Sequence, residues 1–591
     1  MNFYTRELLK EIGFKKIFLL VIVSVFASIF ELVGIGSIGP FINLINDPTY
    51  LSESQLLTKL SNILTVKNDK NFLIYYGILV VFIFILINFY KAWLYYLQNK
   101  VALDFSAFMS CKLFEKYLGN NFNFFLARNS NELGKNIFGE CQTIGNDVIR
   151  NSLVIFSQSI IASFIIILCI AINPKIGLFM IISGSFYYII IYFFLKKWLK
   201  GLGQRQLLHD TNRLKVVIES LSSIKEIKIF KFSDRLLEFF SSETSKFTRN
   251  KIFYTMAATL PRFLIEILGV IIIVVLTVYL TTDAKLKGEA LSIIAVYSFA
   301  TLRLFPIFQQ IYMAIAGVKS AQSRIKLVYE DLKDKNYETI ISPQNQKKII
   351  DKIEFKNLNY SYGERKFCLK DISFDIETGK IFGITGYSGS GKSTLVDIIL
   401  GLLPIQSGFV KVDENMINIS EYEKYQNNFS YVPQNIFIFE DTIKNNLTFS
   451  FNKKTIDQRS LDESIKISQL DDFILKQNDK IDTLIHDKGL SISGGQRQRM
   501  GIARAIYSKK KIIILDEATN SLDGNTEYDV LSGLKENLKN KIIIIVSHRK
   551  TTLKFCDKIV FMNDGKIEDT GNFESLFKSN ENFKKIFNKD L

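Results

Sequence analysis

"KIFGITGYSGSGKSTLVDIIL", residues 380–400, joins a short apolar run to a helical pattern through a glycine-rich turn. Residues 386–393 fit the pattern G-x-x-x-x-G-K-[ST], which binds nucleotide phosphates when it links a strand to a helix. The glycines let backbone N–H groups turn toward phosphate oxygens, and the helix N-terminus adds positive potential. This context predicts a P-loop rather than a chance glycine-rich turn.

Each residue of this loop has an expected place around a bound nucleotide. Lys392 should reach the β- and γ-phosphates, and the hydroxyl of Ser393 should ligate Mg²⁺. The residues expected to line the nucleotide are Gly386, Tyr387, Ser388, Gly389, Ser390, Gly391, Lys392, Ser393 and Thr394. The loop therefore implies a nucleotide and Mg²⁺ as cofactors.

A pair of acids follows about 120 residues later, in "KIIILDEAT" (511–519), which has the pattern of a buried strand ending in two carboxylates. Asp516 is suited to hold a metal ion, and Glu517 is suited to polarise an attacking water. Strand ends also carry acids simply because they are solvated. Together with a P-loop, however, the two acids favour a catalytic interpretation.

The sequence around these motifs alternates short Ile- and Val-rich runs with helical patterns. The expected strands are "GKIFGIT", "NFSYVPQ", "KKIIILDE", "KIIIIVSH" and "DKIVFMNDGKI". Buried parallel strands have this composition, so residues 349–591 are predicted to form one α/β domain. A polar linker at 334–348 separates this domain from residues 1–333.

Residues 1–333 have the composition of a membrane domain. The whole chain is 48% hydrophobic, and six apolar runs meet or approach the length of about 20 residues that crosses a bilayer. These runs are roughly 17–45, 72–97, 152–172, 176–195, 253–281 and 290–316. The connections 98–151 and 196–252 are long and basic, which places them and the N-terminus in the cytoplasm.

The overall composition excludes several other classes of protein. The formal net charge is +16, but Lys and Arg are scattered rather than arranged in stripes, so no nucleic-acid partner is predicted. The five cysteines are far apart and form no CxxC pair, and the chain has only three histidines. A disulfide framework or a zinc site is therefore not expected.

Helices are also expected outside the spans. "CKLFEKYL" and "LLHDTNRLKVVIESL" in the long connections carry apolar residues at helical spacing, which predicts cytoplasmic helical extensions. "LSESQLLTKLSNILTV" (51–66) predicts a short amphipathic helix beyond the first span. That helix would either lie on the outer membrane surface or pack against neighbouring protein.

Five ionisable residues lie inside the apolar runs: the cations Lys91, Arg262 and Arg303, and the acids Glu31 and Glu266. At about 1.5 Å per residue, the three cations lie roughly 21–31 Å below the outer ends of their spans, in the inner half of the bilayer. They could ring a cavity for an anionic head group. Alternatively, Arg262 pairs with Glu266 one helical turn away, and Lys91 and Arg262 extend to the cytoplasmic interface.

"ISGGQRQR" (492–499) lies between the P-loop and the acid pair, and with these motifs in this order the chain resembles ABC transporters. The resemblance implies the type I exporter fold, which is a membrane α-helical bundle with six transmembrane helices plus a cytoplasmic α/β P-loop ATPase domain. It also implies that ATP binds between the P-loop of one subunit and the signature motif of the other. A homodimer is therefore expected, with both sites competent.

The resemblance assigns roles to residues that match the family motifs. Tyr362 would stack on adenine, Gln434 would be the Q-loop residue that contacts the metal and nucleotide, and His548 would contact the γ-phosphate. The signature residues expected to contact ATP are Ser493, Gly494, Gly495 and Gln496. Lys392, Glu517 and His548 are the expected catalytic residues. Ile492 stands where Leu is usual, and Asn520 and Ser521 depart from the common Ser-Ala of the D-loop.

A narrower resemblance concerns the cargo. "FELVGIGSIGPFINLI", "LPRFLIEILG" and "TLRLFPIF" resemble segments of bacterial flippases for lipid-linked oligosaccharides. This implies ATP-driven movement of a polyisoprenyl-pyrophosphate glycan from the cytoplasmic to the periplasmic leaflet of the inner membrane, with Lys91, Arg262 and Arg303 as candidate pyrophosphate contacts. By the same resemblance, segments near 120–130 and 220–230 would be coupling helices.

Two alternatives to this function differ in what ATP drives. One is an exporter of drugs, of lipids similar to lipid A, or of peptides. The other is a channel or regulator with the same fold that uses ATP without pumping. Such proteins often lose a catalytic acid or a signature residue, whereas Lys392, Asp516, Glu517 and His548 are all present here. The second alternative is therefore disfavoured.

Overall fold

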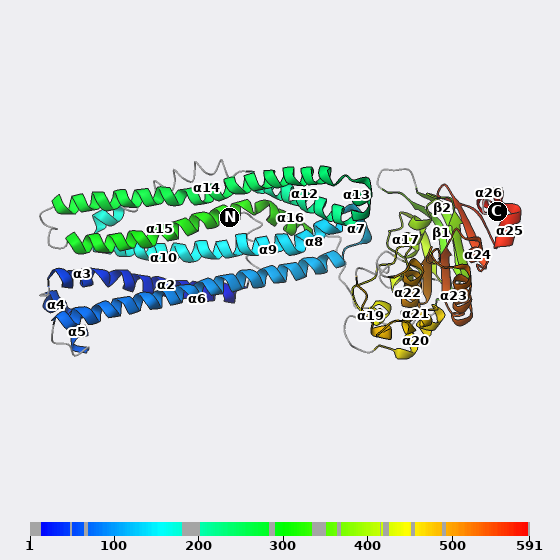
Figure 1. Ribbon diagram of the computed structural model, residues 1–591, viewed down its shortest axis with the longest axis horizontal. Helices are drawn as coiled ribbons and strands as arrows, with labels where there is room; N and C mark the ends of the chain where they lie inside the picture. Colours follow the sequence, from blue (N-terminus) through cyan, green and yellow to red (C-terminus); the bar gives the residue numbers. More distant parts are fainter. Residues whose placement is uncertain are drawn as a thin grey trace. The chain divides into compact units, whose positions relative to one another are not determined.

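The computed structural model describes residues 13–47, 50–63, 69–179, 182, 201–282, 290–333, 350–362, 368–413, 415–417, 425–450, 456–486 and 492–588. The chain divides into two compact units, Met1–Thr339 and Ile340–Leu591. Figure 1 shows the first unit as helical throughout and the second as strands covered by helices. The predicted linker, 334–348, lies outside the described residues.

Long helices build the first unit. They are α2 (Phe14–Gly36), α3 (Ile38–Asn46), α6 (Asp69–Leu118), α10 (Asn151–Ile172), α14 (Ser233–Thr282) and α15 (Ala290–Ser320). Helix α2 packs against α6, α10 packs against both α2 and α15, and α14 packs against α15 (Figure 1). Their facing sides bury a continuous apolar core that includes Ile35, Leu113 and Ala300. Their outer sides expose many Leu, Ile, Val and Phe side chains, as suits a lipid environment.

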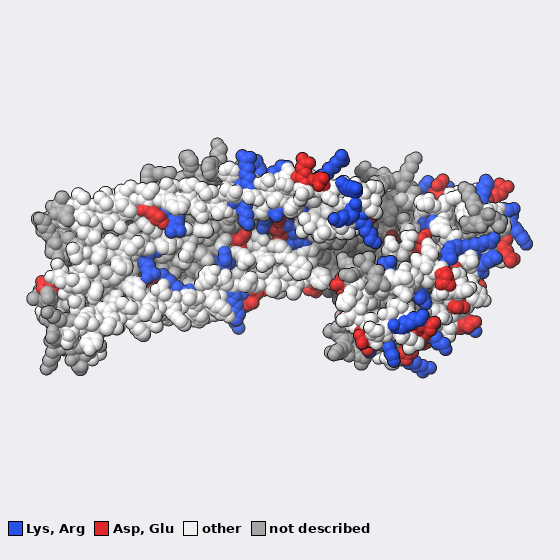
Figure 2. Space-filling view, in the orientation of Figure 1, with Lys and Arg blue, Asp and Glu red and all other residues white. Residues whose placement is uncertain are grey.

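Five helical segments within the described ranges are long and apolar enough to cross a membrane. They are Lys15–Asn46, Asn71–Leu118, Ser130–Ile172, Ser233–Leu280 and Leu291–Ser320. They match five of the six predicted spans to within one residue at the predicted ends that they do not contain, and the remaining prediction, 176–195, falls mostly on residues that are not described. Figure 2 shows charged side chains to be sparse over much of this unit and gathered toward one end.

The predicted helical extensions are confirmed. Helices α6 and α14 are each 50 residues long, about 75 Å at 1.5 Å per residue, which is more than twice the thickness of a bilayer core. "CKLFEKYL" forms the end of α6, and "LLHDTNRLKVVIESL" lies within α12 (Leu202–Ser222). The connections also contain the short helices α7 (Phe122–Ala127), α8 (Ser130–Lys135), α9 (Cys141–Thr143) and α13 (Ile224–Phe230), and α16 (Gln322–Lys333) follows α15.

The predicted amphipathic helix at 51–66 forms two short helices, α4 (Tyr50–Glu53) and α5 (Gln55–Ile63). Leu57 is buried in a small cluster with Leu44 and Phe72, so one face of α5 packs against the protein. Leu56 and Ile63 on the same helix are each 75% exposed. Helix α5 therefore packs against protein on one face and exposes apolar side chains on another.

A six-stranded sheet forms the centre of the second unit, in the order β10-β9-β3-β8-β7-β6. The strands are β3 (Ile381–Gly386), β6 (Phe429–Val432), β7 (Ile512–Asp516), β8 (Ile542–Val546), β9 (Lys558–Asn563) and β10 (Lys566–Gly571). All neighbours pair in parallel except β9 and β10, which form an antiparallel hairpin. The first four predicted segments correspond to the parallel strands β3, β6, β7 and β8. The fifth, "DKIVFMNDGKI", contains the parallel strand β9 and the start of its antiparallel partner β10, so it is not a single strand.

A second sheet, which the sequence analysis did not predict, precedes most of the first along the chain. It is antiparallel, in the order β2-β1-β4-β5, with β1 (Lys352–Tyr360), β2 (Leu369–Glu377), β4 (Ser407–Val412) and β5 (Asn415–Met416). Phe374 stacks on Phe355 within this sheet, with ring centroids 4.6 Å apart. Phe374 also stacks on Phe382 of β3 at 5.3 Å, and this contact joins the two sheets.

Helices pack around both sheets (Figure 1). They are α17 (Lys392–Ile399), α19 (Ile443–Thr448), α20 (Gln458–Ile467), α21 (Asp471–Leu475), α22 (Gly494–Tyr507), α23 (Gly524–Asn537), α24 (Lys550–Leu553), α25 (Phe573–Ser579) and α26 (Glu581–Phe587). Ile502 of α22 and Val530 of α23 are fully buried against the central strands. The nucleotide motifs lie where these strands and helices meet.

Candidate functional site

The P-loop follows β3, one of the two central strands of the sheet. All six residues of β3 are buried, so the loop begins from a rigid base. Gly389 and Gly391 have φ of 78° and 96°, in the left-handed region that favours glycine. At Gly386, a Cβ would lie 2.1 Å from the carbonyl oxygen of Met562, so no larger residue fits there. The backbone conformation at Gly389 and Gly391 and the close contact at Gly386 therefore favour glycine over any residue with a side chain.

Lys392 begins α17 and folds back over the loop that precedes it. Its Nζ donates to the carbonyl oxygens of Gly386 and Tyr387, at 2.9 and 2.8 Å. Lys392 as a whole is 8% exposed, and burial lowers the pKa of its amine. This places one cation at the centre of the predicted phosphate cradle.

The other predicted nucleotide residues lie around the same loop. The hydroxyl of Tyr362 is 3.5 Å from Oγ1 of Thr394, and the Tyr362 ring packs edge-on against Tyr360. Ser388, Gly389 and Ser393 are exposed, whereas Ser390 is buried. Tyr387 packs near Phe561 and donates to the carbonyl oxygen of Asn582 at 3.4 Å. The structure thus brings the predicted aromatic residue and the P-loop together.

The two acids stand at the end of β7, as the strand pattern predicted. Asp516 Oδ2 accepts a hydrogen bond from the hydroxyl of Tyr431 at 3.0 Å. Burial raises the pKa of Asp516, the Tyr431 hydrogen bond lowers it, and the charge of Glu517 raises it again. Glu517 adopts φ of 51°, so the chain turns sharply directly after the strand.

Glu517 is held by three side chains from three different loops. Its Oε2 accepts from Nε2 of Gln434 at 2.7 Å and from Nδ2 of Asn520 at 2.9 Å. Its Oε1 lies 3.5 Å from Nε2 of His548. Burial and the charge of Lys392 lower the pKa of His548, so its ring favours the neutral form. The predicted residues Gln434, Glu517 and His548 therefore meet at one point.

The four signature residues expected to contact ATP, 493–496, form the N-cap and first turn of α22. The side chain of Ser493 accepts from the backbone N–H of Gln496 at 3.2 Å, and the Gln496 side chain accepts from the N–H of Ser493 at 2.9 Å. This is a capping box, which fixes the first turn of the helix. A Cβ on Gly494 or Gly495 would lie 3.3 or 3.0 Å from atoms of Ser521, so the D-loop packs directly against the motif.

Three further residues contact the acids and were not singled out as site residues from the sequence. Tyr431 lies three residues before Gln434, and its hydroxyl reaches Asp516. Gln498 donates to the carbonyl oxygen of Glu517 at 3.3 Å and accepts from the N–H of Ser521 at 2.7 Å. The sequence did flag Asn520 as a departure from the common D-loop pattern, and its contact with Glu517 gives that departure a structural meaning.

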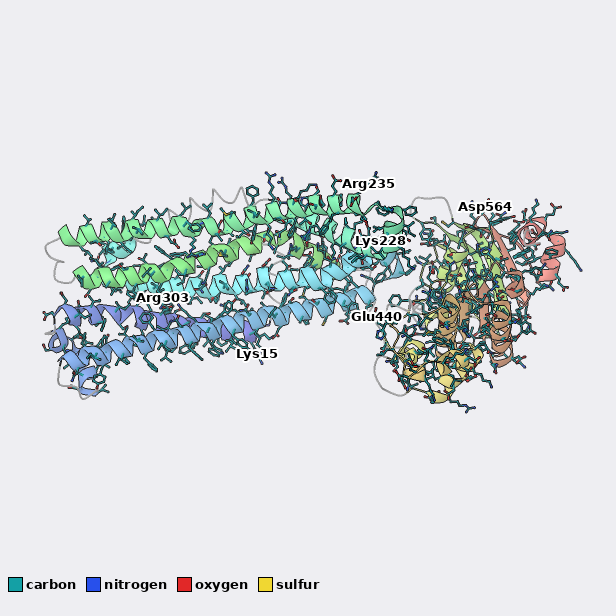
Figure 3. All side chains as sticks on the ribbon, in the orientation of Figure 1. Lys15, Lys228, Arg235, Arg303, Glu440 and Asp564 are labelled. Carbon is teal, nitrogen blue, oxygen red and sulfur yellow. The ribbon has the colours of Figure 1, made fainter. Side chains whose placement is uncertain are left out.

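In the membrane unit, Lys91 and Arg303 meet at a shared acid. Glu31 of α2 is fully buried and forms ion pairs with Nζ of Lys91 and, at 3.7 Å, with Nη1 of Arg303. The guanidinium of Arg303 also lies over the ring of Phe84, 5.1 Å from its centroid. Three spans, α2, α6 and α15, each contribute one charge, and Figure 3 labels Arg303 among these helices.

Arg262 lies apart from that group. Its Nε donates to Oε1 of Glu266 at 2.8 Å, and the two side chains are 56% and 51% exposed. The predicted pairing at i, i+4 is therefore confirmed. Of the three predicted substrate cations, the structure brings Lys91 and Arg303 to one buried acid, while Arg262 pairs on the surface of α14.

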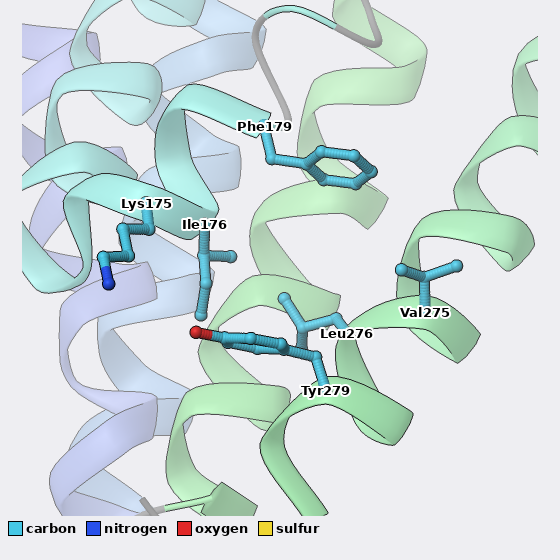
Figure 4. A pocket seen from close by; sticks show the side chains of 6 residues that line it. All are labelled: Lys175, Ile176, Phe179, Val275, Leu276 and Tyr279. Carbon is cyan, nitrogen blue, oxygen red and sulfur yellow. The ribbon is translucent and has the colours of Figure 1, made fainter. Parts of the chain in front are cut away.

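A separate pocket of about 380 Å³ lies near the C-terminal end of α14. Its lining consists of Lys175, Ile176, Phe179, Val275, Leu276 and Tyr279 (Figure 4). Figure 4 shows Ile176 pointing toward Leu276 and Tyr279. The pocket is almost entirely apolar and includes none of the predicted substrate cations.

Comparison with known proteins matches both units to one family. Residues 369–520 match the model of the ABC transporter ATPase domain, described as "ABC transporter". Residues 16–307 match the model described as "ABC transporter transmembrane region". Together the two matches cover most of the chain and agree with the two structural units.

Individual relatives come from several bacteria. An uncharacterized ABC transporter ATP-binding protein of Bacillus subtilis is 29% identical over 379 residues, which is 63% of each chain. An ATP-dependent lipid A-core flippase of Vibrio parahaemolyticus is 35% identical over 229 residues, 39% of each chain. That of Haemophilus influenzae is 34% identical over 238 residues, 40% of each chain.

The fold of the chain also matches a solved structure, a bacterial Atm1-family ABC exporter with ATP bound. The TM-score is 0.80 over 97% of this chain and 98% of that one, at 18% sequence identity, which establishes the shared exporter fold. The candidate membrane spans, the sheet that carries the P-loop and both family matches all indicate a membrane unit followed by an ATPase unit. The chain belongs to the ABC transporter family, as an exporter-type half-transporter that fuses a multi-pass membrane region with an ATPase domain.

Proposed function

We propose that this ABC exporter flips a lipid-linked oligosaccharide, whose lipid is a polyisoprenyl pyrophosphate, from the cytoplasmic to the periplasmic leaflet of the bacterial inner membrane. That the protein couples ATP hydrolysis to export or flipping follows from its family and its exporter relatives. The cargo is the additional step. One observation carries it: Lys91 and Arg303 lie together, partly exposed, between helices of the membrane unit.

The chemistry of these two side chains suits a pyrophosphate. An arginine fork binds phosphate oxygens in pairs, and a lysine amine adds a compact second charge. Charged groups inside a membrane are costly and commonly mark the path of a substrate. Arg262, on α14, remains a third candidate contact because half of its side chain is exposed while it pairs with Glu266.

The ATP site is proposed to work with the residues that the structure brings together. Lys392 would neutralise the β- and γ-phosphates, Glu517 would act as general base, and neutral His548 would contact the γ-phosphate. Tyr362 would stack on adenine. Gln434 donates to Glu517 through Nε2, so its side-chain oxygen stays available to a metal ion.

The donor set fits Mg²⁺. A carboxylate of Asp516, a hydroxyl of Ser393 and an amide oxygen of Gln434 are all oxygen ligands of the kind that Mg²⁺ prefers. The pKa of Asp516 is raised by burial and by the Glu517 charge, and a nearby cation would relieve that cost. When bound, Mg²⁺ would offset negative charge on the phosphates.

We also propose that two copies of the chain act together. A half-transporter carries one P-loop and one signature motif, so a closed nucleotide site would need the motif of a second copy. The short helices α7 and α13 are the proposed coupling segments. Ile229 and Phe230 of α13 are 73% and 72% exposed, an unusual degree for large apolar side chains and one that suits a docking role.

Reconstitution in liposomes tests the cargo. Purified protein with a polyisoprenyl-pyrophosphate glycan in the outer leaflet should move the glycan in the presence of ATP. Arg303→Ala should lower the rate at least about tenfold, because one strong phosphate contact is lost. Lys326→Ala, which removes an exposed lysine outside the predicted spans, is the control and should leave the rate unchanged. Translocation that persists in Arg303→Ala would contradict the head-group role.

The second candidate function is export of another amphipathic cargo, such as a lipid, drug or peptide. It is favoured by the lipid A-core flippases among the relatives, although those matches span only about two fifths of each chain. ATPase activity that responds to drugs or to lipid A, with no movement of the lipid-linked glycan, would support this candidate instead.

A further inference from the structure

Like Glu140, which pairs with Lys135 and Arg324 outside the predicted spans, Glu31 is a buried acid held by ion pairs, and it lies inside a predicted span. Within the described part of the chain its ion partners are Lys91 and Arg303, and its Oε2 has no hydrogen-bond partner. The same face of α2 carries Ser24 and Ser28, but their hydroxyls donate to carbonyl oxygens of their own helix. Glu31 is therefore retained by charge alone.

Asp331 of α16 is a buried acid of the same unit that is held by directional hydrogen bonds. It is 3% exposed and accepts from the hydroxyl of Tyr117 at 2.5 Å and from Nη1 of Arg128 at 2.6 Å. Directional bonds of this kind fix a carboxylate in place. Glu31 has no comparable set, so its two cations are free to exchange it for another anion at smaller cost.

The acid and the two cations of this cluster also differ in their exposure. The side chain of Glu31 is fully buried, whereas those of Lys91 and Arg303 are 30% and 25% exposed. The Arg303 guanidinium is further positioned by the ring of Phe84. An anion could therefore reach the exposed parts of these two cations, whereas the Glu31 carboxylate has no exposed surface.

The count of charges within this cluster is two positive and one negative. Two uncompensated cations inside a bilayer would be costly, and the acid lowers that cost when no cargo is bound. When an anionic head group is bound, the same acid repels it and shares its cations. The acid therefore stabilises the empty state and weakens the loaded one.

We propose that Glu31 is a resident counter-anion of the head-group site, which competes with a diphosphate for Lys91 and Arg303 and so promotes its release. This inference rests on the proposed function, because it assigns the two cations to cargo binding. It adds a residue that limits affinity. A site with both cations and no acid would hold a diphosphate tightly and release it slowly.

Glu31→Gln tests the proposal, because it removes the charge and keeps the size of the side chain. The probe is farnesyl diphosphate, titrated by calorimetry into the full-length protein in nanodiscs without nucleotide. Glu31→Gln should bind it about tenfold more tightly than the wild type, an effect typical of one close charge. Reconstituted Glu31→Gln should also show a lower KM and a lower kcat for glycan translocation. Glu330→Gln removes an exposed acid of α16 outside the predicted spans and is the control.

A second background keeps the test informative if Glu31→Gln alone does not fold. Lys91→Gln leaves one cation facing Glu31, and adding Glu31→Gln to it should tighten binding of the probe about tenfold. Unchanged affinity on removing Glu31, in whichever background folds, would overturn the competing role. Failure of the proposed function has a different signature: the wild type would not bind the probe, and Arg303→Ala would change neither binding nor translocation.

Discussion

At the scale of single residues, Glu517 is the clearest case of a role that contacts support. Gln434, Asn520 and His548 converge on its two oxygens. Glu517→Gln should bind ATP but hydrolyse it at least about 100-fold more slowly, because general base catalysis contributes at least that much. Nucleotide retained after gel filtration, together with phosphate release, measures both properties. Rapid turnover by this variant would rule out Glu517 as the base.

Asn520 gives a second residue-level prediction. Its amide holds the Glu517 oxygen that Gln434 also contacts, so replacing it by the serine common in the family should loosen the carboxylate. Asn520→Ser should lower kcat about threefold to tenfold and leave the KM for ATP unchanged, since one of two hydrogen bonds remains. Asn537→Ser, at an exposed asparagine of α23, is the matched control. A change in KM alone would show that Asn520 acts on nucleotide binding instead.

Asp397 of α17 predicts a dependence of stability on pH. Burial, and secondarily the charge of Asp516, raises its pKa to about 6. An acid whose folded-state pKa is raised binds more protons when folded, so it favours folding at low pH and loses that effect as pH rises from about 4 to about 6. Asp397→Asn should therefore stabilise the protein above pH 6, by about 1 kcal/mol after allowance for solvent around a partly exposed group.

Thermal unfolding in detergent, at pH 4 and pH 7.5 with EDTA and no nucleotide, checks this prediction. The gain in stability of Asp397→Asn over the wild type should be present at pH 7.5 and nearly absent at pH 4. A gain of equal size at both pH values would show that the carboxyl group has no raised pKa.

The charged residues of the spans show which side-chain contacts can be predicted from the sequence and which cannot. The Arg262–Glu266 pair is four residues apart on one helix, so helical geometry alone predicts it. The meeting of Glu31, Lys91 and Arg303 involves three helices separated by up to 272 positions, from residue 31 to residue 303. Such a contact depends on helix packing, and no local pattern encodes it.

At the scale of elements, α22 combines a structural and a catalytic motif in the same residues. Ser493 caps the helix and also belongs to the signature. Ser493→Ala should raise hydrogen exchange at the amide of Gln496 about fivefold, because loss of an N-cap costs about 1 kcal/mol. Ser493→Asn keeps a good cap and should retain protection.

ATPase activity separates the two roles of Ser493. If its hydroxyl contacts the γ-phosphate, both Ser493→Ala and Ser493→Asn should lose activity, although only the first loosens the helix. Full activity in Ser493→Asn would mean that the residue serves the helix alone.

The strands that could be predicted from the sequence differ from the unpredicted ones in how completely their residues are buried. β3, β7 and β8 are buried on both faces, so they appear as unbroken Ile- and Val-rich runs. β1 and β2 alternate buried and exposed residues and include positive φ at Asn357 and Asp371, which breaks the pattern. Apolar runs likewise predicted five spans found here, but α6 and α14 extend far beyond them because polar helical extensions carry no membrane signal.

At the scale of the whole molecule, the nucleotide motifs of one chain form two separate groups. In the P-loop, Lys392 donates to carbonyl oxygens of the same loop. In the signature motif, Gly494 and Gly495 pack against Ser521 of the D-loop. Among the hydrogen bonds of the described ATPase unit, none joins residues 386–394 to residues 492–496. A second copy of the chain would supply the missing half, as proposed above.

Mixed dimers test this composite site directly. Lys392→Ala removes the phosphate cation, and Ser493→Arg places a bulky charge in the signature, so each variant alone should be inactive as a homodimer. A dimer with one chain of each kind would combine both defects in one site and leave the other site with a normal P-loop and a normal signature. Co-expressed chains with different affinity tags, purified through both tags, should therefore regain ATP binding at one site per dimer. If each nucleotide site lay within a single chain, both sites of the mixed dimer would be defective, and no recovery would be seen.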